Sequence, residues 1–282
     1  MLRRYLYIIV TCFGIVSLSA QRGALVNTGS ESQSLGGITT TLDQAEAVFS
    51  NFSSLSSPDN YGLILGSESR FGLSDLTSVA LGGYWQTGES GAIGISLSNY
   101  GFESYNEQTI SGLYQRKLSR QVSASAELGY CRLSLNEFGS TGKAFYRLGV
   151  SGPIKNKLKY GFVISNFEAA RIDVNNTLVS SLAFGLVYTV SSKIKTYIEI
   201  ENEVESPLTV KAGLSYDIHP KLQLRIGART ASGQSGGGFS YKVSSKLIFQ
   251  GHVLFHPVFG VTPGVGIRYQ NSQKDDSIRS KG

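Results

Sequence analysis

The sequence is short of the residues that point to several common protein classes. Its 282 residues include two Cys, one Met, one Trp and six Pro, and only 16% of them are charged. Two Cys can form at most one disulfide, which is too few to stabilise a chain of this length, so a disulfide scaffold is excluded. Past the N-terminus no apolar run approaches the ~18–20 residues of a membrane-spanning helix, which excludes a helical membrane bundle.

The residues that are abundant favour β structure. Hydrophobic residues make up 41% of the chain and aromatic residues 11%, which is too much apolar surface for a disordered protein. The chain also contains 33 Gly and 15 Tyr, and its mean hydropathy is close to zero, at -0.04. A chain that is rich in Gly and Tyr, poor in charge and without long apolar runs favours β structure.

Residues 1–20 have the pattern of a secretory signal peptide, cleaved near Ala20-Gln21. A basic start at Arg3-Arg4 precedes the apolar stretch Tyr5–Ala20, which ends in small residues. An N-terminal anchor is the first alternative, but this stretch is shorter than a spanning helix. Lipidation at Cys12 is the second, and the apolar run before that residue is very short. We therefore expect an exported protein.

Residues 21–59 differ from the rest of the chain, because they are small, polar and irregular. One short helix is expected here. Thr41 and Gln44 have the spacing of a capping box, and Ala45, Val48 and Phe49 recur at helical intervals.

Residues 60–270 alternate between apolar and small or polar residues, as strands do. Between 193 and 201, for example, Ile194, Ile198 and Ile200 fall on one face, and Lys and Glu fall on the other. About fourteen such segments follow one another, each leaving a strand of ~9–11 residues and a short turn. They lie near 60–68, 75–86, 90–101, 104–117, 120–135, 142–152, 156–167, 178–190, 192–202, 207–217, 220–230, 236–243, 245–256 and 259–270.

Such a series predicts either a soluble β protein or a transmembrane antiparallel β-barrel. The second face of the strands holds Gly, Ser, Thr, Lys and Arg with few large apolar groups, which favours a barrel with its apolar face toward lipid. Residues Thr262–Tyr269 also resemble the terminal signal read by the barrel assembly machinery, although a polar tail, 271–282, follows them. The fold class expected is therefore an all-β outer-membrane barrel of about fourteen strands.

Two segments resemble the start of FadL-like outer-membrane proteins. They are Ser34–Gly37, with its Gly-Gly pair, and Asp43–Asn51, which ends in Ala-Val-Phe-Ser-Asn. That group includes long-chain fatty-acid transporters and the PorV-type barrels of the type IX secretion system in Bacteroidetes-type bacteria. Residues Asn51–Leu55 depart from the group's motif, because they lack its Pro and Gly, whereas Gly101–Gln108 and His256–Pro263 are further similar stretches.

The resemblance implies a barrel whose N-terminal segment, 21–59, folds back inside as a plug. The plug or gating residues it points to are Gly36, Gly37, Asp43, Glu46, Phe49, Asn51 and Phe52. The strand pattern adds charges expected to face the lumen, and these are Lys193, Lys195, Lys211, Arg225 and Arg229. A solvated, ion-paired lumen is one interpretation of these charges, and attraction of anionic amphiphiles is the other.

No catalytic or metal-binding pattern stands out. His252 and His256 share a strand face but lie about 13 Å apart along it, too far to hold one metal ion. Residues Gly233–Gly238 lack the Lys-Ser/Thr of a phosphate loop, Cys131 has the setting of a small strand residue, and the basic residues form no nucleic-acid motif. We expect neither an enzyme nor a cofactor.

Two functions stay open at this point. The first is an outer-membrane barrel for passive transport of a small hydrophobic or amphiphilic compound, in which the plug shifts and the ligand leaves through a gap in the wall or to the periplasm. The second is a PorV-type barrel that docks secreted proteins or a secretion complex. The partners expected are outer-membrane lipids, the barrel assembly machinery and either a hydrophobic small molecule or secretion-system proteins, without nucleic acid.

Overall fold

The structure of the protein is a computed structural model. It describes residues 29–56, 60–88, 90–136, 139–166, 180–204 and 206–271, together with the backbone of 171–173 and 176–177. The expected signal peptide, its cleavage near Ala20-Gln21 and the polar tail after residue 271 lie outside the described residues.

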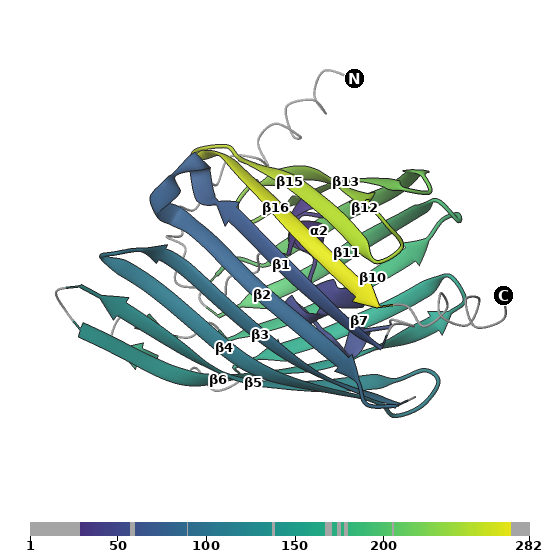
Figure 1. The fold of residues 1–282 in the computed structure, drawn as a ribbon, viewed down its shortest axis with the longest axis horizontal. Helices are drawn as coiled ribbons and strands as arrows, with labels where there is room; N and C mark the ends of the chain where they lie inside the picture. The colour runs from purple at the N-terminus through teal and green to yellow at the C-terminus, as the bar shows by residue number, and fades with distance from the viewer. Residues whose placement is uncertain are drawn as a thin grey trace, which may run out of the picture.

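Fourteen antiparallel strands form one closed barrel (Figure 1). The strands are β1 (Tyr61–Ser69), β2 (Thr77–Gln86), β3 (Gly91–Phe102), β4 (Tyr105–Lys117), β5 (Ser123–Leu135), β6 (Gly139–Lys155), β7 (Leu158–Ser165), β10 (Ser181–Thr189), β11 (Ile194–Glu203), β12 (Thr209–His219), β13 (Leu222–Arg229), β14 (Ser235–Lys242), β15 (Leu247–His256) and β16 (Gly260–Asn271). Two short strands, β8 (Arg171–Asp173) and β9 (Asn176–Thr177), pair separately between β7 and β10. The expected barrel fold is thereby confirmed, and its strands fall where the alternating pattern predicts them.

Pairing of the first strand with the last closes the wall. Tyr61 lies opposite Asn271 and Glu68 lies opposite Gly264, so β1 and β16 are joined along the length of β1. Closure leaves neither the first nor the last strand as a free edge, which is what a sheet surrounded by lipid requires. Within the described barrel ladders the register shifts only near Pro153 and Asp217.

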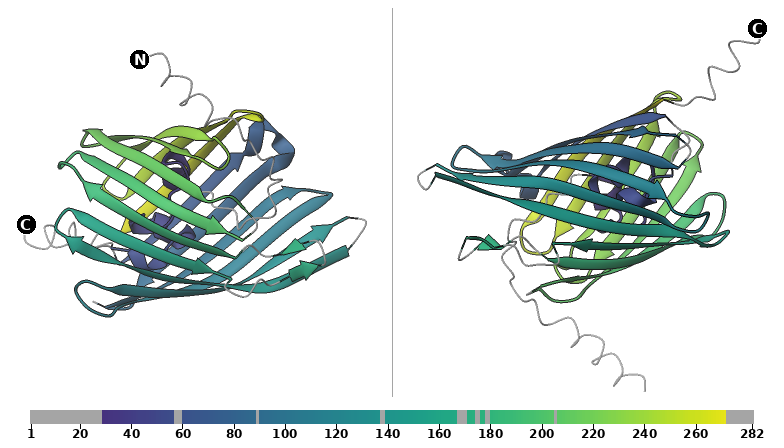
Figure 2. Two further views of the ribbon diagram at one scale, coloured as in Figure 1. Left: turned by 180° about the vertical axis from the view of Figure 1, so that it is seen from behind. Right: turned by 90° about the horizontal axis from the view of Figure 1, so that it is seen from below.

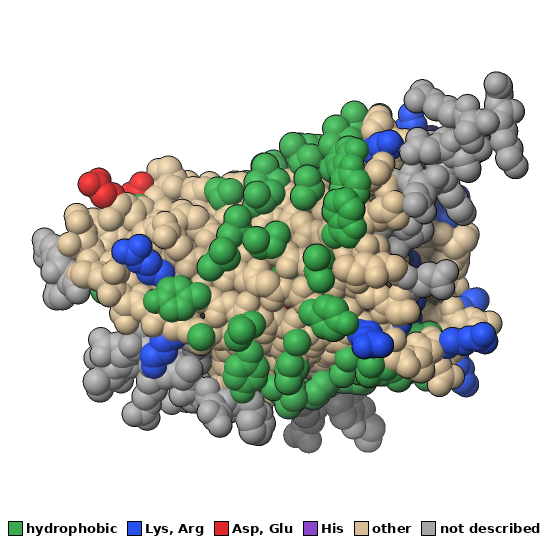
Figure 3. All heavy atoms as spheres, turned by 60° about the horizontal axis from the view of Figure 1, so that its bottom comes forward, with side chains coloured by type: hydrophobic (Ala, Val, Ile, Leu, Met, Phe, Trp, Pro, Cys, Tyr) green, Lys and Arg blue, Asp and Glu red, His purple; other side chains and the backbone are tan. Residues whose placement is uncertain are grey.

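An apolar belt surrounds the outside of the barrel (Figure 3). Outward side chains such as Leu128 and Ile226 are 69% and 62% exposed, an arrangement that is unfavourable in water but suits lipid. At the end of the barrel where β1 begins, Tyr61 stacks on Trp85 with ring centroids 5.5 Å apart. Aromatic rings of this kind are typical of a membrane interface, and Lys and Arg side chains lie beyond the belt at the right of Figure 3.

The N-terminal segment lies inside the barrel (Figure 2). It contains the helix α2 (Ser30–Ser34) and two 3-10 helices, η1 (Gln44–Phe49) and η2 (Phe52–Ser54). No helix in the described residues is long and apolar enough to cross a bilayer. Two further 3-10 turns, η3 (Arg70–Gly72) and η4 (Ser74–Leu76), connect β1 to β2.

The capping box expected between Thr41 and Gln44 does not form. Gln44 begins η1 with a φ of 58°, outside the helical region, and the side chain of Asp43 makes no capping hydrogen bond. The Thr41 hydroxyl is buried and makes no hydrogen bond to the described residues. The start of this short helix is therefore set by its burial against the wall and not by a side-chain cap.

Candidate functional site

The candidate functional site is the lumen of the barrel with residues 29–56 inside it, which we call the plug. Leu35, Ile38, Ala45 and Val48 are completely shielded from solvent, although no strand of the barrel contains them. These plug residues are therefore as deeply buried as those of a protein core, and the contacts of the plug with the wall decide whether the lumen is open.

The Gly-Gly pair of the plug lets its backbone touch the wall. Gly36 and Gly37 have φ values of 79° and 83°, in the left-handed region that favours glycine. A Cβ built on Gly36 would lie 2.6 Å from the carbonyl oxygen of Ala228, and one built on Gly227 would lie 2.4 Å from the Gly36 nitrogen. Glycine is required on both sides of this contact.

One side of the plug is apolar and packs against β1–β4. Phe49 and Phe52 belong to a buried cluster with wall residues from these strands, including Ile64, Ala80, Tyr84, Ala92 and Leu113. Gly82 and Gly94 make room for the rings, because a Cβ on either would come within 3.0 Å of Phe49 or Phe52. This half of the interface resembles a small hydrophobic core, and burying one such ring stabilises the packing by about 2 kcal/mol.

The opposite side of the plug is held by one buried carboxylate. Glu199 of β11 accepts hydrogen bonds from the backbone nitrogens of Thr39 and Thr40, at 2.9 and 2.8 Å, and from both of their hydroxyls. Lys211 of β12 lies 2.8 Å from Glu199 and 2.7 Å from Glu201, and it donates to the Gly37 carbonyl oxygen at 2.8 Å. The charges of the wall are thus paired with each other while they fix the plug backbone.

A second polar cluster surrounds α2. Arg225 of β13 donates to the Ser34 hydroxyl at 2.8 Å, and its guanidinium lies 3.8 Å from Glu31. Arg268 of β16 lies 3.4 Å from the same carboxylate. Glu46 is buried beside them and accepts a 3.2 Å hydrogen bond from the Glu31 nitrogen. Burial, followed by the negative charge of Glu31, raises the pKa of Glu46 to about 7.

Further contacts fix the C-terminal part of the plug. Arg147 of β6 donates to the Ser50 carbonyl oxygen at 3.1 Å and pairs with Glu127 at 2.8 Å. Gln115 of β4 donates to the Leu55 carbonyl oxygen at 3.3 Å. Asn51 donates to the Thr40 carbonyl oxygen at 2.8 Å, which links the C-terminal part of the plug to its middle.

The structure brings most of the sequence-predicted residues together in this site. The plug residues with described contacts are Gly36, Gly37, Glu46, Phe49, Asn51 and Phe52, and the wall bases that reach the plug are Lys211 and Arg225. Arg229 lies nearby, since a Cβ on Gly37 would be 3.4 Å from its guanidinium, and it donates to the Ser232 hydroxyl at 3.0 Å.

Of the three remaining predicted residues, Lys193 is placed differently, whereas Lys195 and Asp43 lie in the lumen and in the plug, as the sequence predicts. Lys193 lies in the exposed turn before β11, outside the lumen, so its assignment as a luminal charge is corrected. The alternating pattern of β11 extends one residue beyond the strand into that turn, which is why it predicts an inward Lys193. Lys195 is on the inner face near the end of the barrel, and Asp43 is half-buried at the start of η1; neither has an ion pair among the described residues.

Sequence reasoning missed Glu31, Gln115 and Arg268 as plug contacts. Gln115 and Arg268 occupy inward positions of alternating strands, which is the only signal that marks them. Glu31 lies in the irregular segment 21–59, where no periodic pattern indicates which residues face the wall. His252, one of the three histidines, is buried on the inner face 3.4 Å from Glu68, and the described residues contain no group of His, Cys, Asp and Glu that would hold a metal ion.

A small pocket lies between the plug and the wall beside Phe49. Its volume is 30 Å³, and it is lined by Val48, Phe49, Ser96, Ser98, Thr109, Ser111, Glu127, Phe145 and Arg147. A cavity that holds benzene measures about 150 Å³, so this pocket is too small for such a molecule in the present conformation. Phe49 is 8% exposed, more than the other apolar plug residues of its cluster.

Comparison with solved structures shows barrels of the same fold. The CymD monoaromatic hydrocarbon channel superposes with a TM-score of 0.64 at 14% identity, over 88% of this chain and 98% of that chain. The Pseudomonas putida toluene transporter TodX gives 0.67 at 11% identity, over 90% and 100%. The Ralstonia pickettii toluene transporter TbuX gives 0.64 at 11% identity, over 88% and 99%.

The sequence comparisons add no closer relative. No protein-family model matches the sequence, and no curated protein matches it. The similarity therefore rests on architecture, over nearly the full length of each neighbour. The chain has the fold of these hydrocarbon channels, a closed fourteen-stranded antiparallel barrel, which is the fold class that the resemblance to FadL-like outer-membrane proteins implies.

Proposed function

We propose that the protein is an outer-membrane channel for the passive passage of a small hydrophobic compound, with the plug as its gate. The observation that carries this proposal is the small pocket beside Phe49, at the boundary between the apolar side of the plug and the serine-lined inner faces of β3 and β4. Three channels of the same fold are named for monoaromatic hydrocarbons or toluene, which supports the substrate class.

Passage requires the plug to move. The pocket is smaller than a benzene molecule needs, and β3 pairs without a break with β2 from Ala92 to Tyr100 and with β4 from Gly91 to Phe102. A gap in the wall, one exit route expected from the sequence, is therefore not present at this strand. Movement of the segment around Phe49 away from β3–β5 is the smallest change that enlarges the pocket, because the Glu199 contacts at Thr39 and Thr40 stay in place.

A disulfide across the gate tests the proposal. The Cβ position of Gly82 lies 2.8 Å from Cγ1 of Val48, which is compatible with a bridge in a Val48→Cys/Gly82→Cys variant. The variant is made in a Cys131→Ser background, because Cys131 is the free thiol of the described residues. Uptake of radiolabelled toluene and of radiolabelled palmitate is measured in intact cells that express it, with and without a reductant.

We expect toluene uptake above that of cells without the protein, loss of this uptake in the oxidised variant, and recovery on reduction. The single Val48→Cys variant in the same background is the control and is expected to be insensitive to the reductant. Uptake no greater than that of cells without the protein, or equal uptake in the locked and reduced states, would overturn the proposal. Uptake of palmitate alone would replace the hydrocarbon by an anionic amphiphile as the substrate.

The docking role considered at first, that of a PorV-type barrel, is not carried forward. No contact or groove among the described residues specifically favours it, and the similar structures are channels. The same neighbours favour a function that is not enzymatic.

A further inference from the structure

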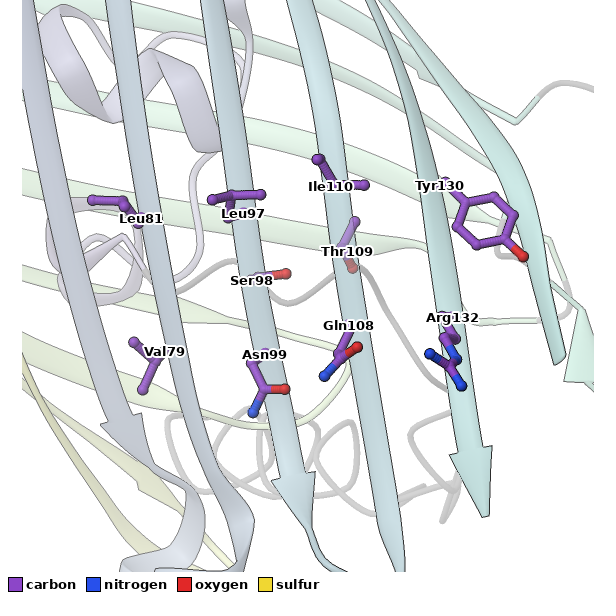
Figure 4. A pocket seen from close by; sticks show the side chains of 10 residues that line it. All are labelled: Val79, Leu81, Leu97, Ser98, Asn99, Gln108, Thr109, Ile110, Tyr130 and Arg132. Atoms are coloured by element: carbon purple, nitrogen blue, oxygen red, sulfur yellow. The ribbon is translucent and has the colours of Figure 1, made fainter. Parts of the chain in front are cut away.

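The outer wall of the barrel contains a groove of 470 Å³ (Figure 4). It extends over four neighbouring strands, with β2 and β5 at its sides and β3 and β4 between them. Most of its side chains belong to the outward set of these strands; Leu97 and Ile110, for example, are 37% and 51% exposed. Most of the groove therefore opens toward the membrane, and Ser98 and Thr109 of the inner face line both the groove and the pocket beside Phe49.

Two rows of side chains cross the groove, one apolar and one polar. The apolar row follows the register of the four strands and consists of Leu81, Leu97, Ile110 and Tyr130. The polar row lies two residues further along each strand, about 7 Å away, and contains Asn99, Gln108 and Arg132. Asn99 faces Gln108 and Gln108 faces Arg132, so three polar side chains stand side by side on the outside of the barrel.

The edge of the apolar belt passes between these rows. On the apolar side the next outward residues are Ile95 of β3 and Leu128 of β5, which are 51% and 69% exposed. On the polar side the next outward residues are Asn106 of β4 and Ser134 of β5. The groove thus crosses from hydrocarbon depth to headgroup depth, and Tyr130 stands at the boundary, where aromatic rings are common.

Arg132 has room for an anion. Its guanidinium donates to the Ser140 hydroxyl at 3.2 Å, and no carboxylate of the described residues pairs with it. A guanidinium offers five N–H donors in a planar fork that matches phosphate oxygens, and an amide offers two more. Arg132 with Gln108 and Asn99 therefore forms a row of donors next to an apolar surface.

We propose that this groove binds a phosphate-bearing lipid of the bilayer. The phosphate lies against Arg132, Gln108 and Asn99, and one acyl chain follows the apolar row across Leu97 and Ile110. The planar fork of Arg132 matches the paired oxygens of a phosphate, and the amides of Gln108 and Asn99 can donate to the same group, so the donor row suits such a headgroup. The inference concerns the outside of the barrel and holds whether or not the lumen conducts.

Native mass spectrometry of the delipidated full-length protein tests this inference. The protein in mild detergent is titrated with dioleoylphosphatidylglycerol, with dioleoylglycerol, which lacks the phosphate, and with oleic acid, which offers a carboxylate. We expect retention of one phosphatidylglycerol molecule and little retention of the other two. Arg132→Gln is expected to weaken this binding about tenfold, the usual effect of losing a charge-assisted contact.

Two further variants make the result specific. Arg132→Lys keeps the charge without the fork and is expected to fall between the wild type and Arg132→Gln. Arg116→Gln removes an exposed, outward arginine of β4 at the opposite end of the strand, and it should bind as the wild type does. The heat-dependent gel shift of each variant confirms that its barrel is folded.

Equal retention by the wild type and Arg132→Gln would overturn the inference. Equal loss in Arg116→Gln would also overturn it, because binding would then follow surface charge alone. Retention of dioleoylglycerol or oleic acid to the same extent as phosphatidylglycerol would show that the groove does not recognise phosphate. If Arg132→Gln does not fold, the comparison of the three lipids on the wild type and on Arg132→Lys decides.

Discussion

Gly36 of the plug and Gly227 of β13 meet backbone to backbone. A Cβ on Gly227 would lie 2.4 Å from the Gly36 nitrogen and 2.1 Å from the Leu35 carbonyl carbon. Neither distance is possible in a packed protein, so the plug approaches the wall here only because both residues lack a side chain. This contact fixes the depth at which α2 lies in the lumen.

Replacing Gly227 should therefore displace the plug. We expect Gly227→Ala to lower the free energy of unfolding by about 2 kcal/mol, because the added methyl group overpacks the contact. It should also expose Glu31 and Glu46 to the protease Glu-C in the folded barrel. The control is Gly237→Ala on the neighbouring β14, where a Cβ would meet the Arg225 carbonyl oxygen at an ordinary 3.4 Å. Equal protease resistance of both variants would contradict the prediction.

Removing the charge of Glu199 should loosen the plug without opening the wall. Glu199→Gln leaves Lys211 with Glu201 but weakens the hydrogen bonds to Thr39 and Thr40. Since breaking a buried pair costs about 3–5 kcal/mol, we expect a lower unfolding temperature and a higher ion conductance in planar bilayers. Glu203→Gln, at the end of the same strand, should change neither property. Unchanged conductance in Glu199→Gln would show that this carboxylate does not hold the plug.

The plug should be held more tightly in mildly acidic solution than in alkaline solution. The pKa of Glu46 rises from 4.5 to about 7 in the folded protein, so folding favours the protonated form. Its contribution is complete below about pH 4.5 and is lost as the pH rises through 7. The charged groups that face Glu46 are Glu31 of α2, Arg225 of β13 and Arg268 of β16.

Ion conductance at pH 5.5 and pH 8 measures this effect. We expect the wild type to open more often at pH 8, and Glu46→Gln, which imitates the protonated acid, to stay closed at both values. A pH dependence that persists in Glu46→Gln would assign the effect to another group.

Truncating Phe49 should turn the small pocket into a binding cavity. Removal of the ring joins its volume to the existing 30 Å³, and the combined space approaches the ~150 Å³ that benzene occupies in a protein cavity. We expect Phe49→Ala to be less stable than the wild type by about 3 kcal/mol and to regain part of this loss when benzene is added.

A shift of the unfolding temperature with benzene concentration measures the binding. Phe249→Ala is the control, because this ring of β15 points outward and is 38% exposed, so its loss leaves no enclosed space. A similar benzene effect in both variants would mean that the hydrocarbon acts on the outer surface or on the detergent.

The strands were predictable because each one separates two different environments. Lipid on one side and plug or water on the other impose an alternation that remains visible in a single sequence, and so all fourteen barrel strands could be located. The alternation also identified Lys211 and Arg225 as inward residues. It failed at Lys193, where the pattern of β11 continued by chance into an exposed turn.

The plug contacts were not predictable in the same way. Arg268 and Glu31 are separated by 237 positions and meet only because the barrel closes around the plug. The helix of the plug shows the same limit, since the spacing of Thr41 and Gln44 suggested a cap, yet the φ of 58° at Gln44 follows from packing. Local sequence patterns contain no information about such distant neighbours.

The short connection between the plug and β1 limits how far the C-terminal end of the plug can move. Only three residues separate Ser56 from Asn60, so the Cα atoms of these two residues cannot be more than about 14 Å apart in any conformation. The C-terminal end of the plug must therefore stay near the mouth of the barrel where β1 begins, however far α2 travels. The whole plug therefore cannot leave through the opposite mouth as a free body, and any movement of α2 takes place while the C-terminal end of the plug stays at the mouth where β1 begins.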